Sequence, residues 1–257
     1  MQHTERFTEL VTGPEDDLAL DEAALLVAAH AHTDLEVDAR RHELDLLAAD
    51  APASDAPALA RFLFQERGFS GNTGDYGDPR NSFLDDVLDR RLGIPITLSV
   101  LMIEVGRRRG IALHGVGMPG HFLVGADGAS YYDTFSGGAE LDVAACIDRF
   151  AQTHPREAFR SEFLSPVGPR SIIDRMLTNL QHTLLAREPS AAVWPVQLRL
   201  RIPDRPLAVR VELGGVLGRL GRFVEAAAVI DAVAAELPDE RGEQLRSTAA
   251  RFRARAN

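Results

Sequence analysis

The fold is decided by residues 95–133, which read PITLSVLMIEVGRRRG (95–110), IALHGVGMPG (111–120), HFLVGADG (121–128) and ASYYD (129–133). The first segment predicts a helix, because Pro95 suits the first turn of a helix and Gly110 suits the position after its end. The later segments are short, bounded by glycine or proline and rich in strand formers, which predicts an antiparallel meander. Its strands are expected over 112–116, 121–124 and 129–133, with a hairpin turn at Asp127-Gly128.

Three helices with apolar stripes are expected upstream of this segment. They span about 18–28, 38–49 and 56–68. Residues 69–79 then hold three glycines among asparagine and aspartate, which predicts a loop. Asn81 or Ser82 is expected to cap a short helix that ends near Arg91. His30 and His32 flank the end of the first helix and are expected to be solvated or to lie at the edge of the core.

The pattern downstream of the meander is helical. A helix over 141–152 follows, with Asp142 near its start. Beyond Pro169 the strand pattern stops, and a faint repeat of 35 residues sets Ala191 and Pro203 against Ala226 and Pro238, which is typical of tetratricopeptide-like helical pairs. The expected organisation is a polar lead-in over 1–16, an α+β domain over 17–165 and an all-α tail over 170–257.

Composition and charge narrow the class of partner. The chain holds 28 basic against 38 acidic residues, a formal charge of −10, which would repel a nucleic-acid backbone or an anionic membrane. No stretch approaches the roughly 18 apolar residues that cross a bilayer, and residues 1–16 lack an apolar leader. Cys146 is the only cysteine, so a disulfide within the chain and a thiolate metal cluster are excluded. A cytoplasmic location is expected.

Four blocks in order resemble the SirB-type family, whose members combine a transglutaminase-like domain with a tetratricopeptide-like tail. The blocks are NSFL (81–84), VLDRRLGIPITLS (87–99), GVGMPGHFLV (115–124) and YDTFSGG (132–138). The resemblance extends from about residue 17 to the C-terminus. It implies a helix-rich papain-like or transglutaminase-like α+β fold with a small antiparallel sheet, and a family whose molecular function is undefined.

The resemblance also implies a site. In active transglutaminase-like enzymes a cysteine at a helix N-terminus is activated by a strand histidine, which an aspartate on the next strand orients. The histidine matches His121 and the aspartate matches Asp133. The family spacing places the nucleophile at Pro95 or Ile96, and no cysteine precedes residue 146. The thiol nucleophile is therefore missing.

Three substitutes for the missing thiol can be considered. Thr97 or Ser99 could act as an alkoxide nucleophile, Cys146 could reach the site from the following helix, or a metal ion could bind His114, His121 and Asp133. Mid-helix hydroxyls commonly bond to the backbone, a lone cysteine among apolar residues is typically a small core residue, and the three metal ligands lack a defined spacing.

We therefore expect His121 and Asp133 to keep a structural contact, with no cofactor and no metal ion. The function expected is that of a noncatalytic scaffold that binds a peptide or protein partner. The alternative is a hydrolase or acyl transferase that uses Thr97 or Ser99 with His121 and Asp133. The partner's identity and the oligomeric state are not encoded in any motif of the chain.

Overall fold

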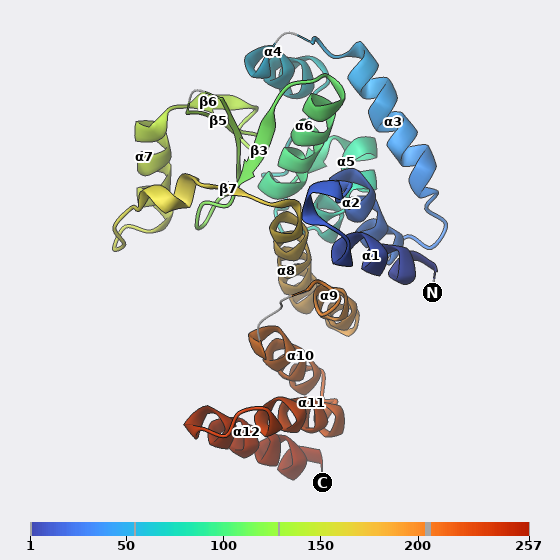
Figure 1. The fold of residues 1–257 in the computed structure, drawn as a ribbon, viewed down its shortest axis with the longest axis vertical. Helices are drawn as coiled ribbons and strands as arrows, with labels where there is room; N and C mark the ends of the chain where they lie inside the picture. Colours follow the sequence, from blue (N-terminus) through green and yellow to red (C-terminus); the bar gives the residue numbers. More distant parts are fainter. Residues whose placement is uncertain (1, 54, 128, 204–206, 257) are drawn as a thin grey trace. The chain divides into compact units, whose positions relative to one another are not determined.

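The computed structural model describes residues 2–53, 55–127, 129–203 and 207–256. The chain divides into two units, Met1–Met176 and Leu177–Asn257 (Figure 1). The division falls inside helix α8 (Pro169–Arg187), whereas the sequence pattern placed it between residues 165 and 170. The proline and glycine residues there mark the start of α8, and a helix start need not be a unit boundary.

The helices of the first unit include one that is buried along its whole length. They are α1 (Gln2–Thr12), α2 (Leu20–Ala29), α3 (Val37–Asp50), α4 (Ala56–Arg61), α5 (Leu84–Arg90), α6 (Pro95–Arg108) and α7 (Val143–Thr153). Shorter helical turns are η1 (Glu15–Asp17), the π-helical η2 (Phe62–Glu66), η3 (Pro79–Ser82) and η4 (Ser161–Leu164). All ten residues of α2 are buried, and α2 contacts α1, α3, α5 and α6. This explains its composition, which is rich in alanine and leucine. No described helix combines the length and hydropathy needed to cross a bilayer.

The prediction of a polar lead-in over 1–16 is wrong for most of that segment, because residues 2–12 form α1. Phe7 and Val11 are fully buried, and α1 packs against α2. The two buried residues lie one helical turn apart, and Leu10 is the only other apolar residue of α1. So short a stripe does not distinguish a docked helix from a solvated segment without knowledge of its partner.

A five-stranded antiparallel sheet completes the first unit, in the order β6-β5-β4-β3-β7. Its strands are β3 (Leu113–Val116), β4 (Leu123–Ala126), β5 (Ser130–Asp133), β6 (Ala139–Leu141) and β7 (Pro166–Val167). A separate parallel pair joins β1 (Ser70–Gly71) to β2 (Leu92–Gly93). The predicted meander is confirmed as β3 to β5, although His121 precedes β4 and is not part of it. Gly128 of the predicted hairpin turn lies outside the described residues.

Helices α6 and α7 cover different parts of the sheet (Figure 1). Helix α6 contacts β3 and β4, and α7 contacts β5 and β6. Side chains alternate between the two faces of a strand. Leu123 and Tyr131 therefore share one face, where they form a core with Cys146 of α7. Val124 and Tyr132, which are paired in register, point to the other face.

The second unit is helical throughout its described residues. Besides the end of α8 it contains η5 (Pro189–Ala192), α9 (Val193–Arg199), α10 (Leu207–Arg219), α11 (Phe223–Ala235) and α12 (Glu240–Ala256). Gly214 lets α10 approach α11, since a Cβ there would lie 2.5 Å from Ile230 Cδ1. The two positions aligned by the predicted repeat differ, because Ala226 lies on α11 but Ala191 lies in η5.

Candidate functional site

The structure brings His121 and Asp133 together. Asp133 ends β5 and is fully buried, and His121 lies in the turn before β4. His121 Nε2 lies 3.0 Å from Asp133 Oδ1. This nitrogen is buried and its approach lacks the angle of a hydrogen bond, so the contact is an ion pair when the imidazole is protonated.

Asp133 has further partners on both of its oxygens. Oδ1 accepts hydrogen bonds from the backbone N–H groups of Phe135 and Ser136, both at 3.1 Å, and Oδ2 accepts one from Ser136 Oγ at 2.9 Å. Arg149 of α7 forms an ion pair with Oδ2. Burial by itself would raise the pKa of Asp133, but the contacts with His121 and the other partners outweigh it and hold that pKa below its ordinary value.

Arg149 belongs to this site although the sequence pattern did not indicate it. It is one of several arginines on helices, and its role depends on how α7 packs against β5. We call His121, Asp133 and Arg149 the remnant site. The Asp133 carboxylate lies between the imidazole of His121, with which it forms the pair that the family resemblance implies, and the guanidinium of Arg149.

The candidate hydroxyls on α6 point to other partners. Thr97 Oγ1 donates to Asn81 O at 2.6 Å and accepts from Ile94 N at 3.2 Å, as part of a capping box at the start of α6. Ser99 Oγ is 3.1 Å from Thr134 Oγ1. Both residues are fully buried, and neither hydroxyl has a hydrogen bond to His121.

Cys146 is a core residue, as predicted. It is fully buried on α7 beside Met118 and Phe150. Burial raises the pKa of its thiol to about 11, mainly by penalising the thiolate. A thiol in this setting is a poor nucleophile at neutral pH.

His114 is not assembled with the remnant site into a metal centre. It lies on β3 opposite Gly125, and its ring covers that glycine so closely that a Cβ there would fall 2.2 Å from Nε2. Burial lowers the pKa of His114, which favours a neutral ring. Over the described part of the chain, the group with ligand atoms close enough to share one ion consists of His32, Asp85 and Asp86.

The loop over 69–79 borders this region through Phe135, two residues after Asp133. The Tyr76 ring packs edge-on against Phe135 with centroids 5.7 Å apart, and a Cβ at Gly71 would lie 2.4 Å from the same ring. Arg175, in the second turn of α8, donates to His121 O at 2.7 Å and faces the Phe122 ring.

The prediction that Asn81 or Ser82 caps a helix is wrong, and Asn81 instead holds the loop in place. It is fully buried, it accepts a hydrogen bond from Asn72 Nδ2 at 3.0 Å, and its own Nδ2 donates to Asp75 O at 2.8 Å. Phe83 occupies the N-cap position of α5 without a side-chain cap. Asn81 joins two parts of the loop by buried hydrogen bonds. The sequence pattern alone does not distinguish this role of an asparagine from helix capping.

Sequence comparison relates the chain to known proteins. The model of the transglutaminase-like superfamily matches residues 24–178. A UPF0162 protein from Xylella fastidiosa (strain Temecula1) is 35% identical, covering 94% of this chain and 96% of its own length. A UPF0162 protein from Vibrio cholerae is 31% identical over 70% of this chain and 69% of its own length. Human F-box only protein 21 is 34% identical over 48% of this chain and 20% of its own length. No solved structure matches the chain.

The superfamily match covers more than half of the chain and includes α6, His121, Asp133 and Arg149. The Xylella relative aligns along almost the whole length of both proteins. The chain therefore belongs to the transglutaminase-like superfamily and to the bacterial UPF0162 proteins.

Proposed function

We propose that this chain is a noncatalytic member of its superfamily whose first unit binds a peptide or a protein segment. The main support for the absence of catalysis is the burial and the hydrogen bonding of the two hydroxyls on α6. Thr97 and Ser99 are buried and hydrogen-bonded to groups other than His121. A general base must lie within hydrogen-bond reach of the nucleophile that it activates. Without a cysteine at Pro95 or Ile96, the remnant site has a base and no nucleophile.

A surface beside the remnant site supports binding. Tyr76 is 57% exposed although its ring packs on Phe135, and the loop that carries it is tied down by Asn81. Arg175 lies next to this loop and interacts electrostatically with Tyr76. We call Tyr76, Phe135 and Arg175 the Tyr76 surface. Tyrosine and arginine on a rigid support are typical of residues that carry binding energy, since little entropy is lost on association.

The second unit is the other part of the proposal. Helices α10 and α11 form a pair joined by a short turn in which Gly221 takes a φ of 75°. We assign this pair to the clearer copy of the predicted tetratricopeptide-like repeat, and helical pairs of that kind present concave binding surfaces. We also propose that the chain is a SirB-type protein and that it is cytoplasmic. Both of these proposals rest on the sequence alone.

Selection from a peptide library displayed on phage tests the binding proposal, with the full chain as bait. Peptides enriched on the wild type should bind Tyr76→Ala at least about tenfold more weakly, which corresponds to losing one central contact. Leu46→Ala is the matched control, since Leu46 is also an exposed apolar residue (57%) but lies on α3 in a separate hollow. Failure to enrich any peptide, or equal affinity for Tyr76→Ala and the wild type, would contradict the proposal.

A further inference from the structure

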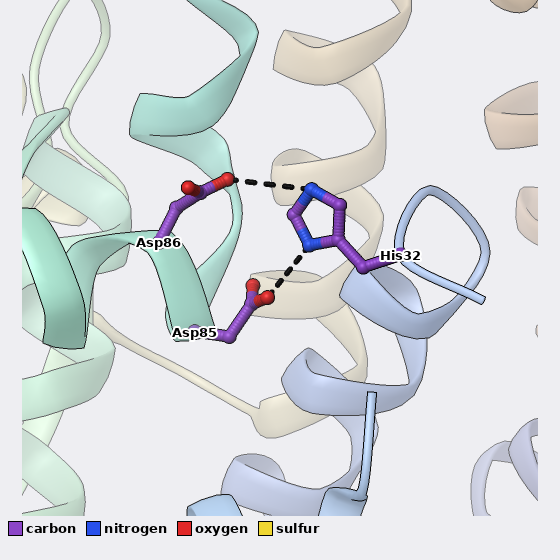
Figure 2. Close-up of side chains that lie close together, drawn as sticks. All are labelled: His32, Asp85 and Asp86. Carbon is purple, nitrogen blue, oxygen red and sulfur yellow. Dashed lines mark hydrogen bonds and ion pairs between the residues drawn. The ribbon is translucent and has the colours of Figure 1, made fainter. Parts of the chain in front are cut away.

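A second cluster of ionisable side chains lies outside the remnant site and consists of His32, Asp85 and Asp86 (Figure 2). His32 follows the C-terminal end of α2, and the two aspartates lie in the first turn of α5. His32 Nδ1 lies 2.6 Å from Asp85 Oδ2, and Nε2 lies 3.5 Å from Asp86 Oδ2. One ligand atom from each residue lies within 4.8 Å of the others.

Two oxygens of this cluster are buried without a hydrogen bond, namely Asp85 Oδ1 and Asp86 Oδ2. Asp85 is only 5% exposed, and Figure 2 shows both of its oxygens directed toward the space bordered by Asp86 and the imidazole. Buried polar atoms in native proteins almost always have a partner, because an unpaired one loses its hydration without gaining a hydrogen bond in return. These oxygens therefore point to a group that the three side chains do not supply.

The cluster also has an excess of negative charge. Two carboxylates face one imidazole, which carries at most one positive charge. The arginines nearest to the aspartates in sequence, Arg80 and Arg90, form their ion pairs with Asp78 and act on Asp86 only at longer range. Among the described residues, no arginine or lysine forms an ion pair with Asp85 or Asp86, so a cation is the group that would complete the cluster.

We propose that His32, Asp85 and Asp86 bind a divalent transition-metal ion of the zinc class. His32 Nε2 and Asp86 Oδ2 supply the first two bonds, and their separation of 3.5 Å is close to the edge of a tetrahedron whose metal–ligand bonds are about 2.0–2.1 Å. Asp85 Oδ2 accepts the Nδ1–H hydrogen bond that fixes the tautomer of the imidazole, which is the usual arrangement behind a metal-bound histidine. The other oxygen of Asp85, Oδ1, is buried in the same cluster without a hydrogen bond.

The ligand chemistry selects among metals. An imidazole nitrogen suits zinc and its neighbours in the first transition row, whereas magnesium and calcium prefer an all-oxygen set. The His32 side chain is 36% exposed, which gives an ion a path to the cluster, and Phe83 restrains the ring by an edge contact with centroids 5.1 Å apart. Water would fill the remaining positions of the ion.

Bound metal would join the end of α2 to the start of α5 and thereby stabilise the folded chain. After treatment with EDTA and dialysis, the full chain should bind one equivalent of Zn²⁺ by calorimetry. Its melting temperature should rise by about 5 °C or more at saturating Zn²⁺, since a ligand specific to the folded state raises Tm by mass action. Mg²⁺ at the same concentration should leave Tm unchanged.

Variants at each position test the assignment. His32→Gln and Asp86→Asn should weaken Zn²⁺ binding more than Asp85→Asn, whose loss should be about 10- to 100-fold, as expected for a residue behind the ligand. Asp89→Asn is the matched control, because Asp89 lies on the same helix but pairs with Arg40 in solvent, and it should bind like the wild type. Absence of zinc binding by the wild type, or unchanged affinity in His32→Gln and Asp86→Asn, overturns the site.

A measurement on the wild type alone keeps the proposal testable if those variants fail to fold. In ¹⁵N spectra of the histidine rings, Zn²⁺ should shift Nε2 of one imidazole while its Nδ1 stays protonated, and nuclear Overhauser contacts with Phe83 should identify that ring as His32. A shift confined to other histidines would overturn the site. So would a spectrum unchanged by Zn²⁺, which would mean that the carboxylates share an imidazolium and no ion.

Discussion

At the scale of single residues, Asp133 is the group on which the remnant site depends. It is fully buried, and it contacts His121, Ser136 and Arg149. A carboxylate whose folded-state pKa is depressed contributes stability that is present above its unfolded pKa, near 3.8, and that is lost as the pH falls through the lower folded value. The contribution is therefore complete at neutral pH.

Asp133→Asn should lower the free energy of unfolding at pH 7 by about 1.5–3 kcal/mol, because charge-assisted hydrogen bonds of a buried group are lost. Urea denaturation of both proteins at pH 7 and at a pH below 3.8 measures this difference. The gap between wild type and variant should narrow at the lower pH, where the carboxylate of the unfolded wild-type chain is protonated. A gap that stays constant across this range would show that the carboxylate's charge is unimportant.

Cys146 provides a second prediction at the residue scale. Because its thiol is buried and has a pKa of about 11, iodoacetamide should not modify the native chain at pH 7.5 but should modify it fully in concentrated urea. Mass spectrometry of the intact chain gives the extent of labelling. Cys146→Ala should cost about 1 kcal/mol in packing. Rapid labelling of the native protein would mean that α7 opens or that the thiol lies elsewhere.

At the scale of elements, the hydroxyl of Thr97 at the start of α6 takes part in buried hydrogen bonds that hold the helix in place. Thr97 Oγ1 links Ile94 at the N-cap to Asn81, which in turn holds the loop over 69–79. The hydroxyl therefore connects the helix to the segment that carries Tyr76. Loss of this hydroxyl should therefore disturb the loop as well as the start of the helix.

Thr97→Val should destabilise the chain by about 1–3 kcal/mol, since it keeps the shape of threonine but leaves the buried carbonyl of Asn81 without its best donor. Thr97→Ser, which retains the hydroxyl, should recover much of that loss and is the control. Thermal and urea unfolding measure both. Equal stability of Thr97→Val and the wild type would remove the hydrogen-bond role and reopen a catalytic one for this residue.

At the scale of the whole molecule, the sequence predicts those helices and strands that a local residue pattern determines. Helices α3 and α6 and strands β3 to β5 follow from periodicity and from glycine and proline, and the pairing of His121 with Asp133 follows from the family resemblance. Helix α1, Arg149 and the Asp85 contact of His32 were not predicted. Each depends on a partner distant in sequence, as His32 and Asp85 are 53 positions apart, and no local signal encodes that partner.

The central claim is that the remnant site lacks a nucleophile, and turnover tests it most directly. The full chain and His121→Ala should be compared on a panel of p-nitrophenyl esters, alkyl thioesters and peptide amides, with Ser99→Ala and iodoacetamide-treated protein alongside. We expect the wild type to hydrolyse these substrates no faster than His121→Ala does. Turnover by the wild type that disappears in His121→Ala, and also in Ser99→Ala or after alkylation, would contradict it.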